Sequence, residues 1–192
     1  MGRAFCRTDS GSDRNTLIFA DTPLRGAFVV ELRTLEDERG FFARSFCTTE
    51  FLAHGVDFRV AQANVCFNRK RGTLRGMHFQ AAPHAEAKLV RCTQGAVWDV
   101  IIDLRPGSST FKRWHAEELS ARNRRALYIP GGFAQGFQSL TDDTELSYLM
   151  SEFYHPESAQ GFRWDDPAFA IRWPVDDPIV SARDRGFPPF PA

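Results

Sequence analysis

Residues 72–91 read GTLRGMHFQAAPHAEAKLVR and gather three side chains that carbonyl chemistry can use. His78 can act as a base, because the pKa of a free imidazole lies near neutral pH. Lys88 can stabilise a developing negative charge, and Arg75 can hold an anion. A lone histidine is more often an ordinary core residue, but the polar neighbours Arg75, Gln80 and Lys88 favour a site. The pattern predicts two strands joined by a loop at 81–85 that contains one proline.

Two further features bear on this chemistry. Arg75 and His78 are three residues apart, so a regular strand would point them to opposite faces. If both act in one site, Gly76 must permit a bulge or a strong twist. Tyr148 and Tyr154 are rival candidates for a proton donor, although each alone is more often ordinary packing in a sheet.

The elements that must position these residues are short strands. From residue 17 onward, apolar runs alternate with turns of Gly, Pro and Asp, and aromatic residues are frequent. This pattern predicts one mainly β domain over 17–192, a sandwich or barrel with a short helix at 48–54 that is capped by Thr49 and ends at Gly55. A coiled C-terminal arm follows Tyr154, and residues 1–16 form a disordered or loosely held lead-in. The expected strands are 27–32, 41–47, 58–68, 73–80, 88–93, 96–105, 111–119, 126–129, 136–139 and 144–152.

The composition excludes several classes of protein. Lys plus Arg balance Asp plus Glu at 24 each, so nothing indicates a nucleic acid or an anionic membrane as partner. No apolar run is long enough to span a membrane, and the N-terminus lacks the apolar segment of a secretory signal. Four scattered cysteines without a CxxC pair are typical of reduced thiols in a cytoplasmic protein.

Two motifs resemble those of the cupins, a class of jelly-roll barrels that often hold a metal. Metal-binding cupins have two histidines one residue apart and a further histidine at the end of a PxGxxH motif. In this chain the first motif reads His78-Phe79-Gln80 and the second reads PGGFAQ, so Gln80 and Gln135 replace two of the expected histidines. Amide oxygens are poor ligands for zinc or iron beside imidazole and carboxylate. We therefore expect a cupin-type jelly-roll barrel without metal or cofactor, which works with side chains alone or only binds.

Longer motifs identify a family. The segments DERGFF, LRGMHFQ, KLVRC, WDVIIDLR, STF and YIPGGFAQGF occur in the same order as in dTDP-4-dehydrorhamnose 3,5-epimerases, which the chain resembles from about residue 24 to about residue 187. The resemblance implies a metal-free homodimeric isomerase of deoxysugar and polysaccharide biosynthesis. Such enzymes invert carbons beside the ketone of a nucleotide-linked 4-keto-6-deoxyhexose.

The resemblance also implies roles for individual residues. His78 matches the base and Asp184 its aspartate partner, while Lys88 matches the lysine that stabilises the enolate and Tyr148 the acid. Polar residues around the sugar and diphosphate match Gln62, Asn64 and Arg75. Arg39 and Phe42 match residues that a swapped N-terminal hairpin presents to the nucleotide in the partner subunit.

Two positions depart from the family pattern and keep alternatives open. Gln135 replaces the histidine of FAHGF, which predicts a change in the inverted carbon or in the seating of the sugar. Arg44 replaces a glutamate near the nucleotide, so a CDP- or GDP-linked sugar is an alternative to dTDP. The other functional hypotheses are a 3,4-ketoisomerase of nucleotide sugars, a non-catalytic binding homologue and, lower in rank, a metal-dependent cupin oxygenase.

Overall fold

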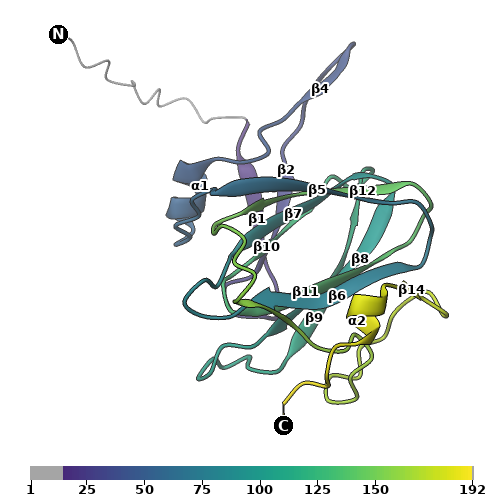
Figure 1. The fold of residues 1–192 in the computed structure, drawn as a ribbon. Helices are drawn as coiled ribbons and strands as arrows, with labels where there is room; N and C mark the ends of the chain where they lie inside the picture. Colours follow the sequence, from purple (N-terminus) through teal and green to yellow (C-terminus); the bar gives the residue numbers. More distant parts are fainter. Residues whose placement is uncertain (1–14, 192) are drawn as a thin grey trace.

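The computed structural model describes residues 15–191, and two mainly antiparallel sheets form its barrel (Figure 1). The first sheet has the strand order β1-β2-β10-β7-β12-β5. Its strands are β1 (Leu17–Asp21), β2 (Phe28–Leu32), β5 (Gln62–Asn68), β7 (Lys88–Gln94), β10 (Ala126–Ile129) and β12 (Thr144–Met150). The prediction of a mainly β, cupin-type barrel is confirmed.

The second sheet has the order β13-β6-β11-β8-β9, and β14 adds to β6 in parallel. Its strands are β6 (Thr73–Gln80), β8 (Ala96–Asp103), β9 (Trp114–Ser120), β11 (Phe133–Ser139), β13 (Ala159–Gly161) and β14 (Ile179–Val180).

The alternation of side chains along β8 explains how the sheets are held together. Val97 and Ile101 point into the core between the sheets, whereas Val100 and Ile102 pack on the other face against residues of the C-terminal arm. All four side chains are fully buried, and each such burial stabilises the fold by roughly 1.5–3 kcal/mol. The two faces of this strand therefore pack into two separate clusters.

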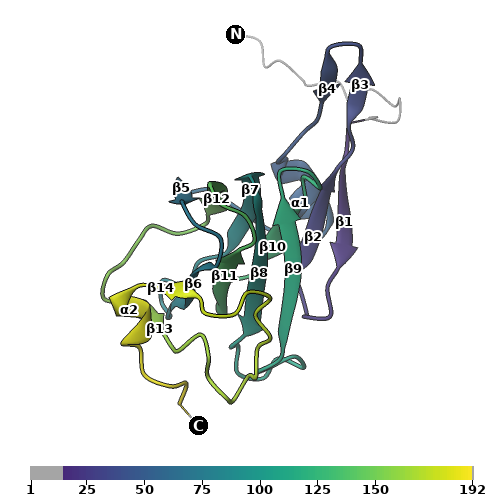
Figure 2. The same ribbon diagram turned by 90° about the vertical axis from the view of Figure 1, so that its right-hand side faces the viewer.

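A two-stranded hairpin of β3 (Leu35–Asp37) and β4 (Gly40–Phe42) extends away from the barrel (Figures 1 and 2). The predicted strand at 41–47 is therefore wrong beyond Phe42, because the chain leaves the hairpin there and enters α1 (Thr48–Ala53). The N-cap of α1 is Cys47 rather than Thr49, and no side chain caps the helix. Phe51 anchors α1 to a cluster of aromatic side chains from β1, β2 and β10.

Several other boundaries differ from the prediction, among them the strand expected at 136–139, which begins at Phe133. The strand expected at 58–68 begins at Gln62, because Phe58 is buried in the aromatic cluster instead of joining the sheet. The strand expected at 111–119 begins at Trp114, because the preceding residues form a turn in which Lys112 has a φ of 60°.

The C-terminal arm is more ordered than its sequence suggests. It supplies β13 and β14 to the edge of the second sheet and contains α2 (Ala182–Arg185), whose N-cap Ser181 accepts a hydrogen bond from the backbone N–H of Asp184. Most of the predicted lead-in, residues 1–14, lies outside the described residues. Within residues 15–191, neither helix is long or apolar enough to cross a membrane.

Candidate active site

His78 on β6 and Asp184 on α2 form a hydrogen-bonded pair. The His78 Nε2 atom lies 2.8 Å from Asp184 Oδ1, and the Gly76 N–H points to Asp184 Oδ2 at 3.4 Å. Burial by itself raises the pKa of Asp184, but the hydrogen bond and charge of His78 and the Gly76 N–H hold that pKa below its ordinary value. The carboxylate is thus ionised at neutral pH and can fix the ring of His78, whose side chain is 39% exposed.

A bulge in β6 brings Arg75 to the same cavity as His78. In the pairing with β11, Arg75 faces Phe137 and His78 faces Gln135, so β6 carries one extra residue between these pairs. Gly76 has a φ of +146°, and a Cβ atom there would lie 2.5 Å from the Cα of Gly136. The predicted need for a glycine at this position is confirmed. The Arg75 Nε atom donates to Asn68 Oδ1 at 2.9 Å.

Lys88 enters the cavity from the opposite sheet, on β7. Its Nζ atom lies 3.2 Å from Glu86 Oε1, and both side chains are almost completely buried. The other oxygen of Glu86 accepts the backbone N–H of Gln80 at 3.1 Å. Leaving this rotamer would separate a buried ammonium from its carboxylate, which is costly. The ion pair therefore holds Lys88 in one position at the cavity wall.

Tyr148 on β12 completes the set. Its pKa is raised, chiefly by burial and further by Cys66, although Arg75 opposes this shift. The phenol is therefore protonated at neutral pH and has a proton to donate. His78 belongs to one sheet, whereas Lys88 and Tyr148 belong to the other, so a bound molecule would lie between His78 and Tyr148.

Two adjoining hollows share His78, Lys88 and Tyr148 in their walls. The inner one has a volume of about 110 Å³ and is also lined by Arg75, Gln135 and Phe137. The outer one has a volume of about 470 Å³ and is also lined by Gln62, Asn64, Glu86, Tyr154, Gln160 and Arg183. A small inner end and a wider outer part suit a ligand with a ring at one end and a bulky substituent at the other.

Gln135 faces a buried carboxylate at the inner end. Its Nε2 atom donates to both oxygens of Asp99, at 2.9 and 3.2 Å. Burial raises the pKa of Asp99 to about 7, and the hydrogen bond from Gln135 and the charge of Lys88 only partly oppose it. The carboxylate of Asp99 accepts hydrogen bonds, so it favours a donor such as the Gln135 amide at this position.

The structure does not bring every expected residue to the cavity. Arg39 and Phe42 lie on the projecting hairpin, where the Arg39 side chain is 84% exposed and paired with Asp37, and Phe42 is 66% exposed. Arg44 pairs with Glu50 of α1 at 2.6 Å and lines neither hollow.

Sequence reasoning missed two carboxylates of the site. Glu86 could have been found, because residues 86 and 88 share one side of an extended chain. Asp99 gave no such signal, because it is one of two aspartates on the alternating strand β8 and nothing in the sequence distinguishes it from Asp103. Tyr154, which we considered only as a proton donor, lies in the outer hollow with 55% of its surface exposed.

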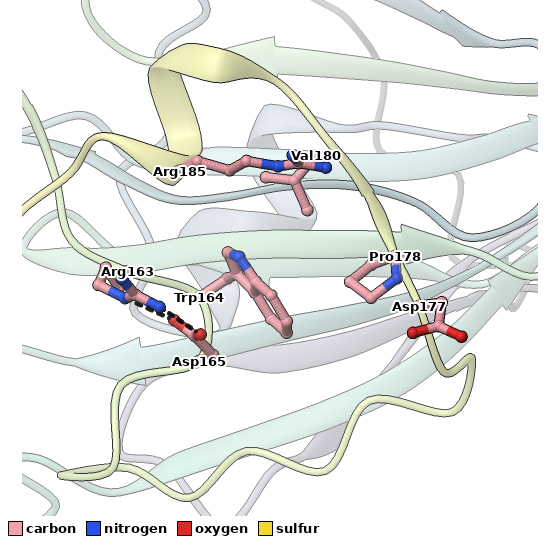
Figure 3. A pocket seen from close by; sticks show the side chains of 7 residues that line it. All are labelled: Arg163, Trp164, Asp165, Asp177, Pro178, Val180 and Arg185. Atoms are coloured by element: carbon pink, nitrogen blue, oxygen red, sulfur yellow. Dashed lines mark hydrogen bonds and ion pairs between the residues drawn. The ribbon is translucent and has the colours of Figure 1, made fainter.

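A third hollow, of about 580 Å³, lies within the C-terminal arm (Figure 3). Its walls include Trp164, Pro178 and Arg185, and the guanidinium of Arg163 is paired there with Asp165 at 2.6 Å. It contains none of His78, Lys88 or Tyr148. Despite its size, it is therefore not part of the candidate active site.

The jelly-roll barrel, with its polar cavity between two sheets, defines a protein of the cupin class. The sequence model of one family, described as dTDP-4-dehydrorhamnose 3,5-epimerase, matches residues 21–191. The chain belongs to this family.

Individual relatives agree with this assignment. A dTDP-4-dehydrorhamnose 3,5-epimerase of Methanothermobacter thermautotrophicus is 42% identical over 175 residues, which are 90% of this chain and 94% of the relative. The structure of a Bacillus anthracis enzyme of the same name, with TDP and PPi bound, superposes with a TM-score of 0.88 at 40% identity, covering 91% of this chain and 100% of that one. A 3'-monoepimerase from Streptomyces bikiniensis in complex with dTDP-quinovose has a TM-score of 0.81 at 39% identity, covering 88% and 85%.

Proposed function

We propose that this protein inverts C3, C5 or both in a nucleotide-linked 4-keto-6-deoxyhexose, with a dTDP-linked sugar as the first candidate. One observation carries the proposal: the His78–Asp184 pair faces a cavity that Lys88 and Tyr148 enter from the other sheet. Family membership supports the substrate class, because the bound molecules named for similar structures are TDP and a dTDP-sugar.

In the proposed mechanism, neutral His78 removes a proton from the carbon beside the ketone. The C–H electron pair moves to form a C=C bond, and the carbonyl π electrons move to oxygen, which gives an enolate. Lys88 donates a hydrogen bond to that oxygen, since the proton is acidic only when the negative charge is stabilised. Asp184 stabilises the imidazolium that forms.

Inversion requires that the new proton arrive on the other face of the enolate. Tyr148 is protonated and lies on the opposite sheet, so it is the proposed donor. As its O–H bond breaks, the enolate collapses to the ketone with the opposite configuration. His78 and Tyr148 then return to their starting protonation states by exchange with solvent.

The outer hollow is the proposed place for the rest of the substrate. Gln62 and Asn64 line this hollow and can donate hydrogen bonds to sugar or phosphate oxygens. Arg75 lines the inner hollow, where it can bind an oxygen of the sugar or of the phosphate next to it. Gln135, bound to Asp99, is the proposed reason for a preference between C3 and C5, because it forms part of the wall of the inner hollow.

The hairpin supports a proposal that the active protein is a homodimer. Arg39 and Phe42 lie outside their own cavity on a segment that projects from the barrel, as expected for side chains that reach a nucleotide in the partner subunit. The outer face of β5 also exposes Val65 (65%) and Phe67 (46%), an apolar surface that a second copy could cover.

Mixing two inactive variants tests this exchange. One carries His78→Asn with an intact hairpin, and the other carries Arg39→Ala and Phe42→Ala with an intact His78. After joint refolding, mixed dimers contain one complete site, so activity should return. No recovery from a mixture shown to be dimeric by sedimentation would contradict the swapped hairpin.

The reaction itself is tested by incubation with dTDP- and CDP-linked 4-keto-6-deoxyglucose in heavy water, followed by NMR. We expect deuterium at C3 or C5 together with an inverted centre. A migrated carbonyl would indicate a ketoisomerase, and tight binding without exchange would indicate a non-catalytic homologue. We place the reaction in the cytoplasm, in keeping with the free thiols of Cys47, Cys66 and Cys92.

A further inference from the structure

A second cluster of metal-ligating side chains lies at the rim of the barrel, outside the proposed catalytic set. His84 belongs to the loop between β6 and β7, and Glu152 and His155 belong to the segment after β12. One ligand atom from each lies within 4.8 Å of the others, and all three residues are half-buried. Among residues 15–191, no other group of histidine, cysteine or acidic residues meets this spacing.

A further carboxylate orients one of the ligands. The His155 Nδ1 atom lies 3.1 Å from Glu157 Oε1, and its Nε2 atom lies 3.8 Å from Glu152 Oε1. When Glu157 accepts a hydrogen bond from Nδ1–H, the lone pair of the neutral ring is on Nε2, the nitrogen nearer Glu152. Carboxylates orient metal-bound histidines in this way in many proteins.

The backbone around the cluster is fixed by a buried amide. Gln80 is 4% exposed, and its Nε2 atom donates to the carbonyl oxygens of His84 and Phe153, both at 3.0 Å. Its Oε1 atom accepts the backbone N–H of His155 at 2.6 Å. One side chain therefore ties together the two segments that carry the three ligands, which lowers the ordering cost of binding an ion.

We propose that His84, Glu152 and His155 bind one transition-metal dication of the zinc type. Two imidazoles and a carboxylate are a common ligand set for Zn²⁺, with a fourth position left for water. The two rings are stacked, with centroids 3.5 Å apart and planes 10° apart. An ion bound by both must lie close to the plane of each ring, so one ring turns about its Cβ–Cγ bond on binding.

Such an ion would act on the rim of the cavity. It would crosslink the 81–87 loop to the segment after β12, and these segments contribute Glu86 and Tyr154 to the outer hollow. Protons compete with the ion for the imidazole nitrogens, so affinity falls as the pH is lowered. The titratable groups that face the two rings are Glu152 and Glu157, whose negative charges favour the ion.

Calorimetric titration of the full chain with ZnCl₂, at a pH where free histidine is neutral, tests the proposal. We expect one site whose Kd rises by at least about tenfold in His84→Ala and in His155→Ala. His54→Ala is the matched control, because His54 contacts Glu50 and Phe19 at α1, away from the cluster, and should leave the Kd unchanged. Equal affinities in all four proteins would overturn the proposal.

Two measurements keep the result independent of folding defects. Zinc should raise the Tm of the wild-type protein and of His54→Ala but not that of the two cluster variants. Anomalous diffraction at the zinc edge should place the ion about 2.0–2.2 Å from the three ligand atoms. A peak at His78 or at a cysteine instead, with none at His84 and His155, would also refute the site.

Discussion

His78 Nε2 lies 2.8 Å from Asp184 Oδ1, although 106 positions separate the two residues in the chain. The histidine stands on β6 near the bulge at Gly76, and the aspartate stands in the first turn of α2. The pair therefore depends on both the barrel and the C-terminal arm.

Replacing His78 by Asn should lower kcat by about 10²–10⁴-fold, because the base is lost while a polar group of similar shape remains. Asp184→Asn should also lower kcat, since an amide cannot stabilise the imidazolium. Solvent deuterium exchange into the keto sugar, measured by NMR, reports both effects. Wild-type exchange in folded His78→Asn protein would refute His78 as the base.

Tyr148→Phe separates proton removal from proton return. The ring that fills the cavity wall is kept, but the donor on the far side is lost. We expect deuterium to enter the substrate carbon with its configuration retained, while formation of the inverted product falls by about 10²-fold or more. Tyr154→Phe, which changes the other phenol of the cavity, should leave the inversion rate within a few-fold. The opposite ranking of these two variants would transfer the role to Tyr154.

Lys88→Met should lower kcat by about 10²–10³-fold, because the enolate oxygen loses its charged donor. Glu86→Gln tests whether the buried carboxylate positions Lys88. Its amide can still accept from the Gln80 N–H, so we expect the fold to survive and kcat to fall less than in Lys88→Met, with KM little changed. An unchanged kcat in Glu86→Gln would show that Lys88 does not need this partner.

The buried carboxylate of Asp99 should make stability depend on pH. Its pKa is raised to about 7 in the folded protein, whereas the unfolded chain has the ordinary value. The folded state therefore holds a proton that the unfolded state has lost, so stability falls as the pH rises between these values and levels off above the folded pKa. Between pH 5 and pH 8 this group should cost about 2–3 kcal/mol.

Urea unfolding of wild type and Asp99→Asn at these two pH values measures the effect. The lowered pKa of Asp184 acts only below the ordinary range for aspartate and does not contribute in this window. We expect the loss of stability from pH 5 to pH 8 to shrink in Asp99→Asn. A loss equal to that of the wild type would show that Asp99 ionises normally.

Gly76→Ala should destabilise the fold by about 2–4 kcal/mol, through the clash with Gly136 and the positive φ. Gly40→Ala is the control, because Gly40 has a φ of +129° but open space around it. The difference between the two free energies of unfolding, from urea titrations, isolates the contact between β6 and β11. Similar losses in both variants would mean that backbone conformation alone requires Gly76.

Much of the barrel could be predicted from local sequence. The strands at 73–80 and 126–129 have the predicted boundaries, because turn residues flank their apolar runs. The arm could not be predicted in this way, since β13 and β14 exist only because the edge of β6 is available to pair with them. The predicted start of the strand at 58–68 was wrong, because Phe58 packs in the aromatic cluster and the strand begins at Gln62.

Only part of the candidate site could be predicted from local sequence. The short-range group of Arg75, His78 and Lys88 was visible in one stretch of chain, and so was the need for a bulge at Gly76. The placement of Asp184 came only from resemblance to a family, because no local pattern encodes a contact across so many residues. The contact between Glu86 and Lys88 was not predicted, although residues 86 and 88 share one side of an extended chain.

The dependence of His78 on α2 has a consequence for how the protein matures. During translation, all strands of the first sheet leave the ribosome before residue 184 does, so a nascent chain can close most of its barrel while the imidazole still lacks its carboxylate. Proteolytic trimming at residue 181 would likewise remove Asp184, together with Phe190, which packs against the second sheet. The C-terminal segment thus supplies the component of the candidate site that is synthesised last.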